Sequence, residues 1–245
     1  EAVREGKTSP PKEDVQRGAR GSENIDNKLS ELKKENNNRI RILVVGVGGG
    51  GSNCVTRLER SGIKSAKTAA VNTDAKHLTQ MTQAQIKILI GRTFTRGLGS
   101  GGDPQIGKAS AEADEKKLRE IIEGNDIVFV IMGAGGGTGS GASPTIARIA
   151  KEEGAVVFGI TTYPFILERG RLKIAQKAIA ELNEECDSVI VIDNNRLTAF
   201  APNLKLDQAF ELVDSVAGRA IRGISDTIMF PSLLNIDYAD VKSVM

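Results

Sequence analysis

Three glycine clusters are the residues of this sequence whose type and spacing point most directly to chemistry. They occupy residues 46–51, 133–141 and 97–102, and each precedes a segment with helical periodicity. Glycine lets bare backbone N–H groups approach a ligand, and the start of a helix adds unpaired donors and partial positive charge. The clusters therefore predict sites for phosphate groups.

The first two clusters together suggest more than a dinucleotide site. Gly46, Gly48 and Gly51 satisfy the pattern G-x-G-x-x-G, and Asp74 stands where a dinucleotide-binding fold has its ribose-binding acid. Such a fold needs one loop, whereas two loops from different strand ends enclose a nucleoside di- or triphosphate from both sides. No G-x-x-x-x-G-K-[ST] motif occurs, so backbone dipoles and a bound cation must balance the phosphate charge. The third cluster either covers the terminal phosphate or is a flexible connection before Pro104.

Composition limits the other possibilities. The 245 residues are 40% hydrophobic and 26% charged, which fits a large globular domain. A net charge of +2 and an aromatic content of 4% argue against nucleic-acid binding. No apolar run is long enough for membrane insertion, and the single histidine leaves no Cys/His metal site. Cys54 and Cys186 suggest packed apolar groups in a cytoplasmic protein, although a helix N-terminus near Cys54 would lower its pKa.

The elements that position the glycine clusters follow from periodicity. Strands are expected at residues 40–45, 68–71, 86–90, 126–132, 155–161 and 188–192, and helices at 52–61, 104–123, 138–153 and 169–184. This alternation predicts an α/β fold, a doubly wound parallel sheet with helices on both faces. Ligands of such sheets bind beyond the carboxyl ends of the strands. A long central helix is expected at 206–228, with one face formed by Phe210, Val213, Ala217, Ala220 and Ile224.

The first 39 residues differ from the rest. Nine are basic, eight are acidic and seven are apolar, so this extension is expected to be largely disordered, with one short helix within residues 22–36. Residues 40–205 are expected to form the nucleotide-binding domain, and 206–245 the central helix and an acidic loop. Because the chain starts without Met and stops soon after this loop, we expect an amino-terminal portion of a longer protein.

Several motifs together resemble those of the tubulin/FtsZ superfamily. GGGTGSG at residues 135–141 resembles the signature of that superfamily, and NTD at 72–74, TTYPF at 161–165, DNN at 193–195 and NIDYADV at 235–241 follow in the same order. The similarity covers residues 39–245. It implies a GTP-binding and GTP-hydrolysing protein of cell division that forms filaments at the division site in the cytoplasm.

The resemblance also implies the roles of individual residues. The phosphates of GTP or GDP, with Mg²⁺ held mainly through phosphates and water, would contact the first two clusters and the 72–74 loop: Gly48, Gly49, Gly50, Gly51, Ser52, Asn53, Asn72, Asp74, Gly135, Gly136, Gly137, Thr138 and Gly139. Glu168 and Arg171 would lie at the ribose, and Asn194, Phe210 and Asp214 at the guanine. Asp214 has a chemical reason as well, because a carboxylate accepts from both N1–H and the 2-amino group of guanine. The i, i+3 spacing of Glu168 and Arg171 also fits an ordinary pair on the surface of a helix.

The acidic motif of Asn235, Asp237 and Asp240 is implied to be catalytic. An unbroken helix from Phe210 to Ile228 would carry the chain about 27 Å from the base, so Asp237 would act on the next subunit of a head-to-tail homopolymer. The acids are also typical of an ordinary helix N-terminus. Without the resemblance, that second interpretation is favoured.

Other functions remain open at this stage. A filament for cell shape and a non-hydrolysing GTP-dependent assembly module are related alternatives, and an NAD-dependent oxidoreductase is a distant one. The resemblance also implies membrane adaptors, bound through a C-terminal tail that this chain lacks. Whether this segment polymerises or hydrolyses GTP by itself is left open.

Overall fold

The computed structural model describes residues 40–200 and 204–229. Contacts divide the chain into two units, Glu1–Arg39 and Ile40–Met245, and all described residues belong to the second. The helix expected within residues 22–36 and the acidic motif of Asn235, Asp237 and Asp240 lie outside the described residues.

Six parallel strands form one sheet in the order β3-β2-β1-β4-β5-β6. They are β1 (Ile42–Val47), β2 (Lys67–Asn72), β3 (Ile86–Leu89), β4 (Ile127–Gly133), β5 (Val156–Tyr163) and β6 (Ser188–Asp193). The chain winds outward from β1 to β3 and then returns to add β4 on the other side of β1. The neighbours β1 and β4 therefore mark the switch point, where a crevice opens at the carboxyl ends of the strands.

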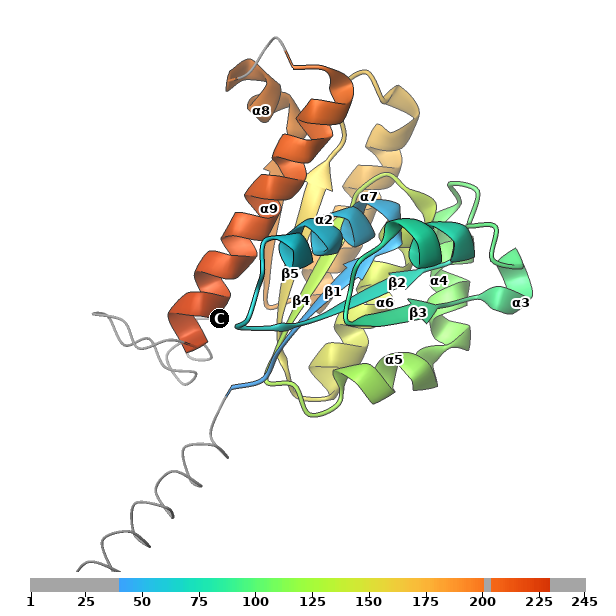
Figure 1. Cartoon of the computed structure of the whole chain (residues 1–245). Coiled ribbons are helices and arrows are strands. Elements are labelled where there is room, and N and C mark those ends of the chain that lie inside the picture. Colours follow the sequence, from blue (N-terminus) through green and yellow to red (C-terminus); the bar gives the residue numbers. More distant parts are fainter. Residues whose placement is uncertain (1–39, 201–203, 230–245) are drawn as a thin grey trace, which may run out of the picture. The chain divides into compact units, whose positions relative to one another are not determined.

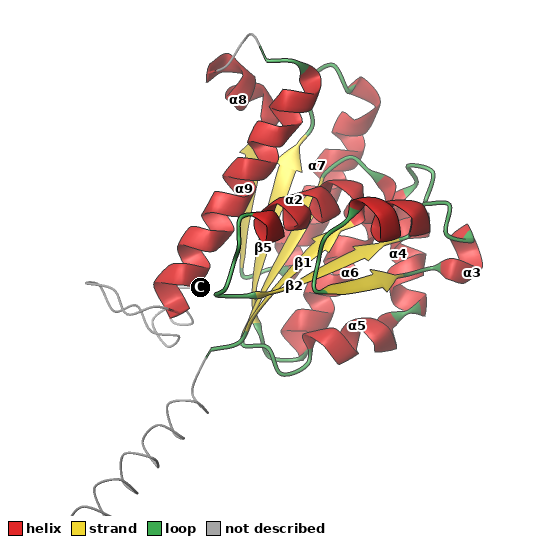
Figure 2. Ribbon diagram, viewed as in Figure 1, coloured by secondary structure: helices red, strands yellow, loops and turns green. Residues whose placement is uncertain are grey.

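Helices cover both faces of the sheet (Figure 1; Figure 2). One face packs against α2 (Gly48–Arg60) and α9 (Leu206–Met229), and the other against α4 (Pro104–Ala113), α5 (Glu115–Ile122), α6 (Gly137–Glu152) and α7 (Arg169–Glu185). Along β1, Ile42 and Val44 face α2 and α9, whereas Leu43 and Val45 face the other layer. Both sides of each central strand are buried, so the strands are almost continuously apolar. The predicted fold class is confirmed.

Some helices differ from the expectation. The predicted helix at 104–123 is two helices that meet at Asp114, whose carboxylate Oδ2 accepts from the backbone N–H of Gly91 at 2.8 Å. Helix α2 begins at Gly48, four residues before the expected start. Three short helices carry too little periodicity to be predicted: the π-helix η1 (His77–Met81), α3 (Arg92–Thr95) and α8 (Asn194–Phe200).

The buried stripe of α9 is rotated relative to the expected one. It consists of Ala209, Val213, Ala217, Ile221 and Ser225, each four residues apart. Val213 and Ala217 were predicted, whereas Ala220 and Ile224 are half-buried and Phe210 is 38% exposed. Ser225 is buried because its Oγ lies 3.0 Å from Oγ of Ser65 and donates to the Ile221 carbonyl. Apolar periodicity does not identify a buried polar residue such as Ser225.

Helices α4 and α6 approach each other closely through two glycines. A Cβ added at Gly107 would lie 2.5 Å from the Gly137 carbonyl oxygen, and one at Gly141 would lie 1.9 Å from that of Pro104. This contact holds the glycine cluster at 97–102, which leads into α4, beside the start of α6.

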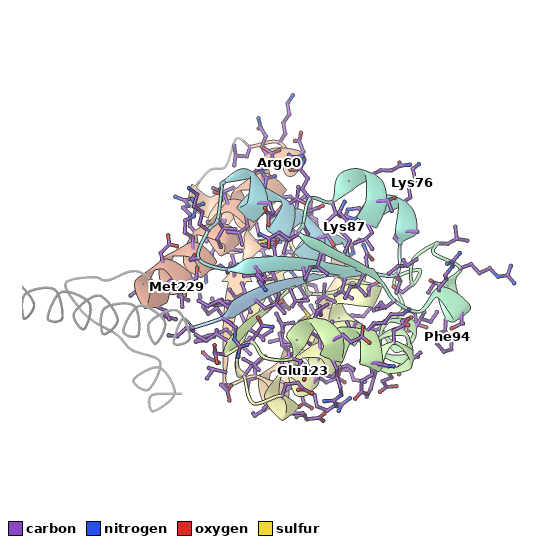
Figure 3. All side chains as sticks on the ribbon, turned by 60° about the horizontal axis from the view of Figure 1, so that its bottom comes forward. Arg60, Lys76, Lys87, Phe94, Glu123 and Met229 are labelled. Atoms are coloured by element: carbon purple, nitrogen blue, oxygen red, sulfur yellow. The ribbon has the colours of Figure 1, made fainter. Side chains whose placement is uncertain are left out.

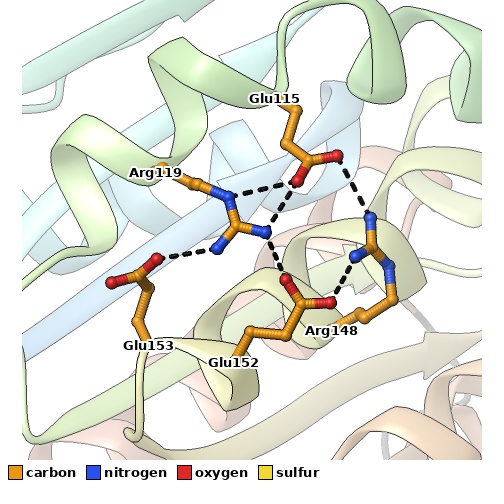
Figure 4. A network of polar contacts seen from close by, with 5 residues as sticks. All are labelled: Glu115, Arg119, Arg148, Glu152 and Glu153. Atoms are coloured by element: carbon orange, nitrogen blue, oxygen red, sulfur yellow. Dashed lines mark hydrogen bonds and ion pairs between the residues drawn. The ribbon is translucent and has the colours of Figure 1, made fainter.

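An ion-pair network joins α5 to the last turn of α6 (Figure 4). Arg119 contacts Glu115 and Glu153, both at 2.7 Å, and also Glu152, while Arg148 bonds Glu152 at 2.5 Å and Glu115 at 3.3 Å. Hydrogen bonds from the two arginines lower the pKa values of Glu115 and Glu152. Single exposed ion pairs contribute little, but a network orders several side chains together. It lies at the end of α6 away from the glycine loops.

The close contact of α4 with α6 predicts opposite effects for two glycine substitutions. Gly141→Ala should lower the free energy of unfolding by about 1–3 kcal/mol or more, because its Cβ has no space. Gly223→Ala on the exposed face of α9 is the matched control, since no described atom lies within 4 Å of its Cβ. It should raise the free energy of unfolding by about 0.5–1 kcal/mol. Urea unfolding of both variants tests this, and equal effects would contradict the packing.

Candidate functional site

A cleft of about 590 Å³ lies over the carboxyl ends of β1, β2, β4, β5 and β6. This volume is within the usual range for small-molecule sites. Its lining includes most of the residues expected to bind nucleotide: Gly49, Gly50, Asn53, Asn72, Asp74, Gly136, Gly137, Thr138, Gly139, Glu168, Arg171, Asn194, Phe210 and Asp214. The structure thus brings these residues together, and their roles in binding stay predictions.

Two helix N-termini form the floor of the cleft. Helix α2 begins at Gly48 and α6 at Gly137, and neither has a side-chain hydrogen bond at its N-cap. The first N–H groups of both helices are therefore left for a ligand. A Cβ added at Gly49 would meet no described atom within 4 Å, so bare backbone borders the cleft there. The floor is suited to an anion.

Four of the expected residues lie behind the lining rather than in it. Gly48 has φ +70° and an added Cβ would lie 2.7 Å from the Gly139 nitrogen, while one at Gly51 would lie 2.3 Å from the Ile131 carbonyl. A Cβ at Gly135 would collide with Arg171. Ser52 is fully buried, and its Oγ has no hydrogen-bond partner among the described residues. The glycines therefore serve close packing.

A chain of hydroxyl groups connects three loops at the phosphate side. Thr138 Oγ1, on the first turn of α6, lies 2.6 Å from Thr73 Oγ1 and 3.1 Å from Ser100 Oγ. Gly99, Gly101 and Gly102 also line the cleft. The third glycine cluster is thus part of the wall. Sequence reasoning did not select Thr73 or Ser100 as site residues, although a polar residue directly after a buried strand was a usable signal.

The opposite side of the cleft offers contacts for a base. Asn194 is 2% exposed, and its carbonyl oxygen Oδ1 has no hydrogen-bond partner among the described residues. A buried acceptor without a partner, in the wall of a cleft, is available to an N–H group of a ligand. The ring of Phe210 meets that of Phe165 edge-on, with centroids 5.2 Å apart, and stays partly exposed. An apolar ring and a free acceptor suit a heterocyclic base.

Asp214 lies on the same side and is mostly buried. Its Oδ2 is 3.6 Å from Nε of Arg57, which also contacts Glu211 at 3.5 Å. Burial raises the pKa of Asp214 to about 6, although Arg57 partly offsets this effect. Cys54 Sγ lies 3.7 Å from the Asp214 carbonyl oxygen, and burial raises the pKa of this thiol as well. The helix N-terminus expected to lower the pKa of Cys54 does not determine it.

Glu168 and Arg171 form an ion pair of 2.7 Å at the rim, and Glu168 Oε1 also accepts from the Phe165 N–H at 3.1 Å. They are both a helix pair and part of the lining. His77 is half-buried and lines the cleft too. Thr162, Pro164 and Val213 also line the cleft, although the sequence did not assign them to the site.

Two kinds of feature are absent from the described residues. They contain no group of three or more His, Cys, Asp or Glu side chains that could hold a metal ion. Within the same residues, no helix has the length and apolar character needed to cross a membrane.

Comparison with known proteins gives consistent matches. Residues 41–202 match the model of the tubulin/FtsZ family, GTPase domain. The chain is 51% identical to cell division protein FtsZ 2 of Methanocaldococcus jannaschii over 212 residues, which are 86% of this chain and 56% of the relative. It is 42% identical to cell division protein FtsZ 1 of Archaeoglobus fulgidus over 227 residues, 92% of this chain and 61% of the relative. The chain thus spans little more than half the length of these curated relatives.

Solved structures agree. An empty FtsZ dimer from M. jannaschii superposes with a TM-score of 0.83 at 41% identity, covering 90% of this chain and 64% of that chain. A protofilament of CetZ2 from Haloferax volcanii gives a TM-score of 0.66 at 23% identity, covering 76% of this chain and 58% of that chain. This likeness shows a shared fold. With the family model matched over most of the described residues and relatives above 40% identity, the chain belongs to the tubulin/FtsZ family.

Proposed function

We propose that this chain binds and hydrolyses GTP and assembles head-to-tail into a filament of cell division. The observation that carries the proposal is a cleft whose lining combines two helix N-termini without side-chain caps, the mostly buried carboxylate of Asp214 and the buried Asn194 oxygen, which has no partner among the described residues. The relatives named cell division protein FtsZ support the cellular role. An NAD-dependent oxidoreductase is not proposed, because membership of this family and the second glycine loop both favour GTP.

Guanine recognition is assigned to Asp214 and Asn194. A carboxylate accepts from N1–H and the 2-amino group of guanine, and adenine has no such pair of donors. Because Asp214 is already desolvated, it gains more from these two hydrogen bonds than an exposed carboxylate would. Phe210 would pack on the base, and Glu168 and Arg171 would border the ribose.

The phosphates are assigned to the starts of α2 and α6. Their N–H groups and dipoles would replace water around the phosphate oxygens, and the hydroxyl of Thr138 lies on the same turn. Mg²⁺ would be bound mainly through phosphate oxygens and water, and would stabilise charge on the group being transferred.

Hydrolysis is proposed to need the next subunit. From Asp214, α9 rises about 22 Å to Met229, which lies beside Ile40 and Ile42 at the amino end of β1. Figure 3 shows Met229 and Phe94 at opposite ends of the described unit. Asp237 lies eight residues after Met229. Eight residues reach about 28 Å, and only when the chain is fully extended. Head-to-tail stacking would instead bring Asn235, Asp237 and Asp240 to the neighbour's cleft, where they position the attacking water.

Other parts of the proposal follow from the relatives. Self-association is supported by the FtsZ dimer among the solved structures. A cytoplasmic position at the division site and membrane adaptors bound through a further C-terminal segment are proposed with it.

Asp214→Asn should change the base that is recognised. Asparagine presents one acceptor and one donor, which match N1–H and the C2 carbonyl of xanthine, so affinity should fall about 100-fold for GTP and rise for XTP. Titration of the variant and the unchanged chain with GTP, XTP and ATP measures this. Retained GTP preference would remove Asp214 from the base site.

The raised pKa of Asp214 predicts two pH dependences. GTP affinity should fall as pH drops below about 6, because a protonated carboxyl cannot accept both hydrogen bonds. The folded state also holds this proton more tightly than the unfolded state. The free energy of unfolding should therefore fall as pH rises from about 4 to 6, by at most about 3 kcal/mol. Asp214→Asn should remove both dependences, as binding and urea titrations at several pH values would show.

Catalysis by the neighbouring subunit can be tested with two variants, neither of which should form GDP alone. Asp237→Ala keeps the GTP site but lacks the acidic residue, whereas Asp214→Asn keeps the acidic residue but takes XTP. With GTP and XTP present, GDP should form only when the variants are mixed, at roughly a quarter of the interfaces in an equal mixture. GDP formation by Asp237→Ala alone would contradict the proposal, and none in the unchanged chain would favour a non-hydrolysing assembly module.

A further inference from the structure

His77 is the remaining ionisable group of the cleft without a role. It lies on the first residue of η1, directly after the loop of Asn72 and Asp74, and it lines the cleft beside Leu98 and Gly99. The strand before this loop, β2, is separated by β1, β4 and β5 from β6, which precedes Asn194. A nucleotide whose base contacts Asp214 would therefore extend its phosphate chain toward His77.

The hydrogen bonds of Asn72 determine the tautomer of the neutral His77 ring. Asn72 Oδ1 accepts from the backbone N–H groups of Thr73, at 2.8 Å, and Asp74, at 3.3 Å. Its amide nitrogen Nδ2 must then point the other way, where it lies 3.4 Å from Nδ1 of His77. Because Nδ2 can only donate, Nδ1 accepts, and the proton of the neutral ring lies on Nε2.

Thr82 allows the same ring to carry a second proton. Its Oγ1 lies 3.4 Å from Nδ1 and donates to the His77 carbonyl at 3.1 Å, so its lone pairs are available to an N–H at Nδ1. Nδ1 therefore has a hydrogen-bond partner whether the ring is neutral or positively charged. In both states Nε2 carries a proton, and among the described residues Nε2 has no hydrogen-bond partner. That donor is left for a ligand.

Positive charge is scarce among the residues that line the cleft. Only Arg171 and His77 have side chains that can carry it, and Arg171 is paired with Glu168 at 2.7 Å. A triphosphate carries more negative charge than a diphosphate, so one added positive charge at the phosphate end favours the triphosphate.

The elements around His77 contribute further titratable groups. Asp74 Oδ1 accepts from the His77 backbone N–H at 2.9 Å. The strands against which η1 packs contribute Lys67 and Lys87, and Lys76 is exposed on the surface (Figure 3). Across the cleft lie Glu168, Arg171 and Asp214.

We propose that Nε2 of His77 donates a hydrogen bond to the terminal phosphate of the bound guanine nucleotide, and that the charge of His77 sets the preference for GTP over GDP. This inference rests on the proposed function and names a specificity-determining residue within it. A protonated imidazole donates from both ring nitrogens and adds one positive charge at the phosphate end. GTP preference therefore rises as pH falls.

The test is the ratio of GTP to GDP affinity at pH 6 and pH 8. The ratio cancels effects on the base, including protonation of Asp214, because both nucleotides carry guanine. For the unchanged chain it should be about five- to tenfold higher at pH 6 than at pH 8, as expected for a charge-assisted hydrogen bond. In His77→Gln, a neutral donor, it should stay near the pH 8 value, and in His77→Lys it should be high at both pH values.

Lys76→Gln is the matched control, since it removes an exposed positive charge from the neighbouring residue and should leave the pH dependence intact. Thermal unfolding of each variant checks that the fold is retained. A ratio that depends on pH equally in the unchanged chain and in His77→Gln would overturn the inference. If GTP, GDP and ATP all bind alike, the proposed function itself fails, which is a distinguishable result.

Discussion

Two helix starts lie against each other at the switch point of the sheet, and the site depends on this contact. A Cβ at Gly48 would lie 2.7 Å from the backbone of α6, and one at Gly50 would lie 3.1 Å from Gly133. Both helices present partial positive charge and unpaired N–H groups at the same place. Bringing them together is unfavourable until an anion lies between them. The arrangement therefore gains most from a ligand with several negative charges.

Recognition of the base has a cost of its own. The carboxylate of Asp214 is buried at the expense of stability, since its pKa is raised mainly by loss of water. Arg57 offsets only part of this penalty. Guanine can restore the lost hydrogen bonds from its own N–H groups, so a group that destabilises the empty protein strengthens the complex. Burial of Asp214 therefore favours selective recognition of guanine and lowers the stability of the empty protein.

The sequence predicted the sheet better than it predicted the walls of the cleft. All six strands were expected, because buried parallel strands are apolar on both faces. On α9, Ser225 was not expected, because its buried position depends on a hydrogen bond to Ser65 that an apolar pattern does not include. Ala209 and Ile221 were missed as well, although both are apolar. Helices η1 and α8 were missed because they are too short to show periodicity. Without η1, the sequence did not place His77 and Thr82 near the cleft. The roles of Asn235, Asp237 and Asp240 still rest on resemblance.

Cys54 offers a way to observe motion at the base side of the cleft. The residue is 2% exposed, its sulfur lies 3.7 Å from the Asp214 carbonyl oxygen of α9, and burial holds the thiol in its neutral form. A thiol reagent reaches such a group only when α2 and α9 separate, because the thiolate is the reactive species. The rate of alkylation therefore reports how often this part of the protein opens, and Cys186, buried beneath α7, provides an internal reference in the opposite layer.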